Sequence, residues 1–157
     1  MQESIYVGLD LGSSFCCQSV VNADGSVLSS RFVRTGERQL LDAFAGLGDG
    51  EVRVHMEAGE HADRASSVIG PLVSRVVVSH PGSLTWIRKH STKDDRVDAR
   101  KLAELLSLGR VHDVYRERDT ERRTFKHLLT HHEQMSREQA RRKSKIKARL
   151  RTLGIIR

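Results

Sequence analysis

The chain has 157 residues, of which 38% are hydrophobic and 4% aromatic, and it carries a formal net charge of +7. This length suits one ordinary domain with an appendage. No stretch approaches the roughly 20 apolar residues of a membrane-spanning helix, and the first residues lack the pattern of a secretory signal. We therefore expect a cytoplasmic location. Cys16 and Cys17 are adjacent in a predicted strand and face opposite sides, which argues against a disulfide or a metal site there.

Three strands are predicted at the start of the chain, over residues 4–9, 15–22 and 27–33. The turn between the second and third contains Asp24 and Gly25, a pair typical of tight hairpins. The simplest arrangement is an antiparallel three-strand meander.

The next part of the chain alternates between helices and strands. Apolar spacing predicts helices over residues 37–47 and 61–69 and a short helix near residues 84–88, with strands over residues 52–56 and 73–79. A meander followed by such alternation predicts an α/β fold with a mixed central sheet and flanking helices.

Residues 92–106, with the sequence TKDDRVDARKLAELL, form the start of a further predicted helix. At about 100° per residue, four apolar residues share one stripe: Ala99, Leu102, Ala103 and Leu106. Asp95 continues this inward stripe, Asp98 borders it, and Asp94 points toward solvent. Carboxylates that face a packed layer cost several kcal/mol unless they are paired or bind a metal.

Positive charge is concentrated at the C-terminal end. Residues 116–157 contain 14 Lys and Arg against 5 Asp and Glu, whereas the rest contains 13 against 15. Residues 120–153 can form one long helix whose apolar residues gather at its two ends, which favours pairing into a homodimer or higher oligomer. Such a basic arm suits a polyanion, with nucleic acid as the leading candidate and a solvated charged helix as the alternative. Its candidate phosphate contacts are Arg141, Arg142, Lys143, Lys145, Lys147, Arg149 and Arg151.

Four acids stand at the ends of predicted elements. Asp10 ends the first strand in GLDLGSS, and Glu57 follows the fourth strand in VHMEAG. They would converge with Asp95 and Asp98 if the first and fourth strands are neighbours. Repelling carboxylates need cations, and hard oxygen ligands select Mg²⁺ or Mn²⁺. Two such ions about 4 Å apart can activate a water or hydroxyl and stabilise the leaving oxygen of a phosphodiester.

The segments YVGLDLGSS, HMEAG and TKDDRVDARKLAELL, with SREQARRKSKIKARLRTLGI further on, resemble the DEDD transposases of bacterial insertion sequences, the IS110 group related to the Piv pilin-gene invertase. The resemblance covers nearly the whole chain. It implies a RuvC-like, ribonuclease-H-like catalytic domain at residues 1–114 and a basic, coiled-coil-like helical segment at residues 115–157. It also implies that the four acids bind divalent metal, that DNA is the substrate, and that a structured guide RNA bridges donor and target DNA. A bacterial, nucleoid-associated location would follow.

The sequence departs from that family in two places. Asp94 stands where the family usually has a small residue such as Thr. Family members also continue into a second domain with a serine thought to be the nucleophile of strand exchange, so a chain that ends at Arg157 is expected to be incomplete for recombination. Lys93 and Arg96 flank the acidic motif and are further candidate phosphate contacts, with solvated ion pairs as the alternative.

Three other functions fit part of the pattern. GLDLGSS is similar to the first phosphate loop of actin-like ATPases and sugar kinases, although a second Asp-Gly phosphate loop is lacking. A RuvC-like junction resolvase would be a compact chain without the long basic helix. A non-catalytic nucleic-acid-binding fragment is the third. His55 is interpreted as an outward-facing strand residue and Trp86 as a packing residue.

Overall fold

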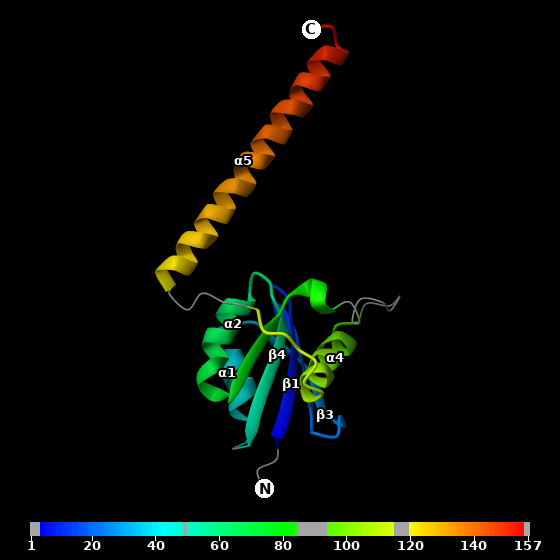
Figure 1. Ribbon diagram of the computed structural model, residues 1–157, viewed down its shortest axis with the longest axis vertical. Coiled ribbons are helices and arrows are strands. Elements are labelled where there is room, and N and C mark those ends of the chain that lie inside the picture. The colour runs from blue at the N-terminus through cyan, green and yellow to red at the C-terminus, as the bar shows by residue number, and fades with distance from the viewer. Residues whose placement is uncertain (1–3, 49, 85–93, 115–119, 156–157) are drawn as a thin grey trace. The chain divides into compact units, whose positions relative to one another are not determined.

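The computed structural model describes residues 4–48, 50–84, 94–114 and 120–155, and Figure 1 shows its elements. The chain divides into two compact units, Met1–Val114 and Tyr115–Arg157. The first unit contains a sheet with helices, and the second contains a single long helix.

Five strands form one mixed sheet in the order β3-β2-β1-β4-β5. The first three, β1 (Ser4–Leu11), β2 (Phe15–Val21) and β3 (Val27–Arg34), form the predicted antiparallel meander. The other two, β4 (Glu51–Glu57) and β5 (Arg75–Ser79), run parallel to β1. The mixed α/β class is therefore confirmed, and this strand order is consistent with a ribonuclease-H-like fold.

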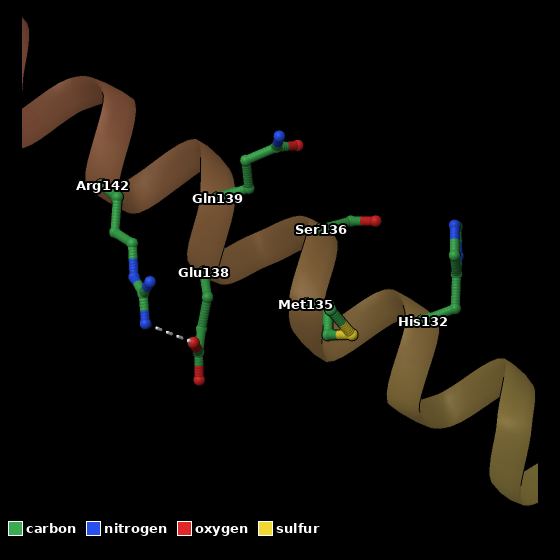
Figure 2. A pocket seen from close by; sticks show the side chains of 6 residues that line it. All are labelled: His132, Met135, Ser136, Glu138, Gln139 and Arg142. Carbon is green, nitrogen blue, oxygen red and sulfur yellow. Dashed lines mark hydrogen bonds and ion pairs between the residues drawn. The ribbon is translucent and has the colours of Figure 1, made fainter.

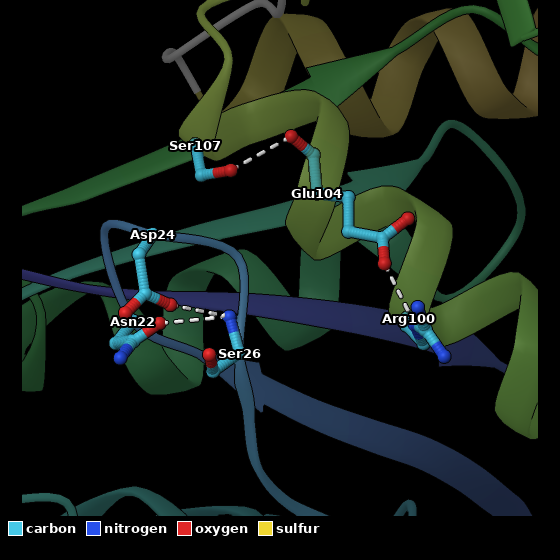
Figure 3. Close-up of polar contacts among 6 residues, drawn as sticks. All are labelled: Asn22, Asp24, Ser26, Arg100, Glu104 and Ser107. Carbon is cyan, nitrogen blue, oxygen red and sulfur yellow. Dashed lines mark hydrogen bonds and ion pairs between the residues drawn. The ribbon is translucent and has the colours of Figure 1, made fainter.

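The β2–β3 turn explains how the meander reverses direction. The backbone N–H of Ser26 donates to Asn22 Oδ1 at 2.9 Å and to Asp24 Oδ1 at 2.8 Å (Figure 3). Gly25 has a φ of 88°, a backbone conformation that side chains disfavour. The Asp-Gly pair thus closes the hairpin as its sequence predicts.

Helices cover both faces of the sheet. In Figure 1, α1 (Glu37–Ala45) and α2 (Ala62–Ile69) lie on one face and α4 (Asp95–Ser107) lies on the other. Two short 3-10 turns, η1 (Gly70–Leu72) and η2 (Pro81–Leu84), flank β5. The predicted helix near residues 84–88 falls almost wholly outside the described residues. The main apolar core lies between the sheet and α1 and α2, and includes Val7, Leu40, Phe44, Val54 and Met56.

The α4 helix buries the four predicted residues Ala99, Leu102, Ala103 and Leu106. It packs chiefly on β1 and β2, and it approaches β1 so closely at Gly8 that no side chain fits there. A Cβ at Gly8 would overlap the carbonyl oxygen of Ala99 and would lie 2.6 Å from the amide nitrogen of Ala103. Gly8 therefore fixes the height of α4 above the sheet.

The second unit is the helix α5 (Thr120–Thr152), which is followed by a turn at Gly154 with a φ of 70°. The left-handed conformation at this glycine is a common way to terminate a helix. Large apolar side chains on α5 are exposed, including Phe125, Leu128, Met135 and Ile146. Among the described residues, no helix is long and apolar enough to cross a membrane.

Candidate active site

Asp10 and Glu57 lie at the carboxyl ends of two neighbouring parallel strands. Leu9 of β1 pairs with Met56 of β4. Asp10 directly follows Leu9, and Glu57 directly follows Met56. Hydrogen-bonded strands lie about 4.8 Å apart, so the two acids occupy adjacent positions along one sheet edge. The first and fourth strands are therefore neighbours, which is the condition that convergence of the acids requires.

The two acids also share a face of the sheet. Side chains alternate along a strand, so Asp10 faces the same side as Gly8, and Glu57 the same side as His55. Gly8 contacts α4 and the His55 ring bonds to the Leu102 carbonyl in α4. Asp10 and Glu57, both half-buried, therefore belong to the α4 face.

The other two predicted acids lie in the first turn of α4. Asp98 is half-buried, as expected for a residue that borders the apolar stripe, whereas Asp95 is exposed. The prediction that Asp95 continues the buried stripe is therefore wrong. Asp95 is the first residue of the helix, one turn before Ala99, where the buried stripe begins.

Asp94 has a structural role that explains its place in the motif. It is the N-cap of α4, and its Oδ1 accepts a hydrogen bond from the Arg96 backbone N–H at 2.9 Å. Thr is also a favoured N-cap residue, so Asp and Thr are interchangeable here in physical terms. The departure from the resembled motif therefore preserves the cap, and it leaves Asp95 and Asp98 as the pair in the first turn.

Cys17 links the acids of the sheet to those of α4. It pairs with Asp10 across β1 and β2, and it is almost fully buried. Burial raises the pKa of the Cys17 thiol, and the negative charges of Asp10 and Asp95 raise it further, while a Ser30 hydrogen bond and the Arg96 charge lower it. The charges of Asp10 and Asp95 thus act on the same thiol. Cys16, on the opposite face, is also free, and burial raises its pKa to about 11.

The carboxylates are of the right type for a hard cation, since Mg²⁺ and Mn²⁺ prefer oxygen ligands. Within the described parts of the chain, however, no three His, Cys, Asp or Glu residues are grouped so that they could hold a metal ion. Like charges repel without a cation between them. A metal site at this edge would therefore need the acidic side chains to turn toward one another.

His55 is fully buried, and the prediction that it faces outward is wrong. Its Nδ1 lies 2.8 Å from the Leu102 carbonyl oxygen and its Nε2 lies 2.9 Å from Ser79 Oγ. Ser79 Oγ also lies 2.9 Å from the carbonyl oxygen of His112. Burial lowers the pKa of His55, which favours the neutral ring. A proton on Nδ1 would be donated to the Leu102 carbonyl, and the one Ser79 hydroxyl proton could then be donated to Nε2 or to the His112 carbonyl. The alternation of VRVHM placed His55 correctly on the face opposite Val54, but it could not show that α4 covers that face.

The candidate phosphate contacts are placed as follows. Lys93 and Trp86 lie outside the described residues. The Arg96 guanidinium is 5.3 Å from the centre of the Phe32 ring in β3. All seven basic candidates on α5 are exposed. Figure 2 shows side chains that line a pocket along that helix, from His132 and Met135 to Arg142, which forms an ion pair with Glu138 at 3.3 Å.

Comparison with models of protein families gives a match. A family model described as a transposase, the DEDD transposases of the IS110 group, matches residues 7–155. No curated protein matched the chain. The family match spans most of β1 and all of β4, α4 and α5, and so includes all four acids.

Proposed function

This chain belongs to the DEDD transposases of the IS110 group, and we propose that it is the N-terminal catalytic part of a metal-dependent recombinase that acts on DNA phosphodiesters. The observation that carries this proposal is the placement of four acids. Asp10 and Glu57 end neighbouring parallel strands on the face covered by α4, and Asp95 and Asp98 lie in the first turn of that helix. Ligands commonly bind outside the carboxyl ends of strands in such sheets.

In this proposal Asp10, Glu57, Asp95 and Asp98 hold Mg²⁺ or Mn²⁺. The bound cations would supply an activated water or hydroxyl and charge stabilisation of the leaving oxygen. The chain itself contributes rigid positions for the carboxylates, because Gly8 seats α4 on β1 and the Asp94 cap fixes the first turn. The partial positive charge of the α4 N-terminus also reduces the repulsion between Asp95 and Asp98.

Metal binding tests this proposal directly. We expect a variant with Asp10→Asn, Glu57→Gln, Asp95→Asn and Asp98→Asn to lose Mn²⁺ binding in calorimetry. A matched variant with the same change in charge, carrying Asp24→Asn, Asp42→Asn, Asp63→Asn and Glu60→Gln, should keep it. Equal Mn²⁺ affinity in the two variants would contradict the proposed site.

The basic helix α5 is proposed to hold nucleic acid. Seven exposed Lys and Arg residues between Arg141 and Arg151 surround the helix and can reach phosphates from several directions. Each phosphate contact releases counterions, so affinity should fall steeply with salt. We expect neutralisation of these seven residues to Gln to flatten the plot of log affinity against log salt for duplex DNA. An unchanged slope would remove α5 from the interface.

A structured guide RNA is the second proposed ligand of α5, carried over from the resembled family. Contact with phosphates from more than one direction suits a folded RNA as well as a duplex. Competition between an RNA hairpin and duplex DNA of equal length tests this role. We expect the hairpin to displace the duplex, and the seven-Gln variant to weaken both. Failure of the hairpin to compete would remove RNA from the proposal and leave DNA.

Self-association through α5 is also proposed. Phe125, Leu128 and Met135 are exposed in the first half of the helix, Ile146 is exposed in the second half, and Leu153 is exposed just after the helix ends. Successive members of this set are three, seven, eleven and seven positions apart, so in a helix their side chains lie on one side. Sedimentation at several protein concentrations should therefore reveal a dimer or higher oligomer. A bacterial cytoplasmic location at the nucleoid follows if chromosomal DNA is the substrate.

A further inference from the structure

Two exposed phenylalanines lie beside the acids on the α4 face of the sheet. Phe15 at the start of β2 is 52% exposed and Phe32 in β3 is 50% exposed. Aromatic rings exposed to this degree lack the favourable free energy that burial of their apolar surface would give. A patch of this kind indicates a ligand surface.

The sheet register places both rings on one face and near one another. Phe32 pairs with Cys17, and Phe15 precedes Cys17 by two residues, so the three side chains point to the same side. Phe15 and Phe32 are therefore diagonal neighbours, about 7–8 Å apart. Because Cys17 also pairs with Asp10, the patch borders the candidate active site.

Each ring is accompanied by an arginine from a different element. The Arg34 guanidinium lies 5.8 Å from the centre of the Phe15 ring, and the Arg96 guanidinium lies 5.3 Å from the centre of the Phe32 ring. Neither arginine forms an ion pair with another described residue. Their charges are thus available to an anion at the same place as the exposed ring faces.

We propose that Phe15, Phe32, Arg34 and Arg96 form a stacking platform for an unpaired nucleotide of the DNA strand next to the four acids. Aromatic rings and guanidinium planes stack on nucleobases without regard to sequence, and the arginine charges complement the adjacent phosphates. A protein partner would gain from the apolar rings, but it would not need two planar cations beside them. This inference rests on the proposed function, since it assigns a subsite to the same DNA.

The platform also suits the chemistry of the neighbouring acids. An in-line attack on a phosphodiester requires the phosphate to be held in one orientation. Stacking of the adjacent base on Phe15 or Phe32 would fix the strand on one side of Asp10 and Asp95. The residues of the platform are positioning residues in this account, because the acids alone face the reacting phosphate.

Binding of a single-stranded oligodeoxynucleotide that carries one 2-aminopurine tests the platform, with the full chain and with Ca²⁺ to neutralise the acids. We expect the fluorescence of 2-aminopurine to be quenched on binding, as stacking requires. Phe15→Leu and Phe32→Leu, which keep most of the apolar volume, should each weaken binding roughly tenfold and relieve the quench. Phe15→Tyr and Phe32→Tyr keep the ring and should retain both.

Controls separate the platform from other roles. Leu72→Ala, at another exposed apolar side chain, should bind the oligonucleotide as the unchanged chain does. Circular dichroism of each variant checks its fold. Duplex DNA of the same sequence tests the proposed function independently. If the unchanged chain fails to bind the duplex, the proposed function fails. If it binds but the Leu variants bind the single strand normally, the platform alone is wrong.

A protein interface would give a different result. If the Leu variants bind the oligonucleotide normally but shift the sedimentation coefficient of the chain, the patch joins two copies and the platform is overturned. Equal losses for single-stranded and duplex DNA would also overturn it, because a paired base cannot stack on the rings.

Discussion

The helices α4 and α5 carry similar apolar patterns but have different environments. Four apolar residues of α4 are buried on the sheet, with Leu102 only 2% exposed, whereas Leu128 of α5 is 64% exposed. Both patterns predict an amphipathic helix. An apolar stripe therefore indicates that a helix needs a partner, and α4 finds its partner in the sheet of its own unit.

The largest effect is expected where α4 rests on β1. Gly8→Ala should cost about 5 kcal/mol or more, the low end of the whole stability of a domain, because its Cβ would overlap the α4 backbone, which cannot move aside. Chemical denaturation measures this loss. Gly46→Ala is the matched control, since nothing lies within 4 Å of its Cβ position. A small loss at Gly8 would mean that α4 does not sit closely on the sheet.

Leucine truncation compares the two helices directly. Leu102→Ala should cost about 2–5 kcal/mol, the range for a buried leucine, whereas Leu128→Ala should change the free energy of unfolding by less than about 0.5 kcal/mol at low protein concentration, as for other surface positions. Urea denaturation of both variants gives the values. A large effect of Leu128→Ala that grows with protein concentration would support self-association through α5, and one that does not would place a partner for α5 within the chain.

The cap of α4 gives a smaller effect. Asp94→Ala should cost about 1 kcal/mol, since it removes the acceptor of the Arg96 N–H. Asp94→Thr keeps an acceptor and should be nearly neutral. Thermal unfolding followed by circular dichroism distinguishes the two variants. If Thr is as costly as Ala, Asp94 acts through its charge and the capping account of the motif is wrong.

The smallest effects are expected at the surface ion pairs of each helix. Arg100 and Glu104 of α4 lie 2.6 Å apart (Figure 3), and Arg142 and Glu138 of α5 lie 3.3 Å apart. Exposed pairs four residues apart contribute only about 0.3–0.5 kcal/mol. Double-mutant cycles should yield couplings of this size that decrease with salt. The order of the two residues along the helix favours a larger coupling energy for the α5 pair, because its Glu precedes its Arg and so suits the helix dipole.

Local sequence predicted most of the elements correctly. All five strands and the helices α1, α2, α4 and α5 agree with the prediction to within a few residues. Apolar periodicity and the Asp-Gly turn act between near neighbours in the chain, so they can be interpreted without the fold. The buried residues of α4 followed from the same periodicity.

The errors concern residues whose environment depends on a distant element. His55 is buried because α4, some 40 residues later, covers its face, and its ring then bonds to Leu102 and Ser79. Asp95 has the helical phase of a buried residue but stands at the helix end and is exposed. The phase of a residue gives its direction from the helix axis, but it does not show whether anything lies there.

The sequence by itself determined the types and order of the elements, the four acids at element ends, and the family to which the chain belongs. Only the tertiary structure decided that β1 and β4 are neighbours, that Asp10 and Glu57 lie on the face of the sheet on which α4 packs, and that Phe15 and Phe32 lie on the same face. The reason is physical. Turns and helical stripes depend on contacts between residues a few positions apart, whereas strand order and helix placement depend on which apolar faces meet across the whole unit.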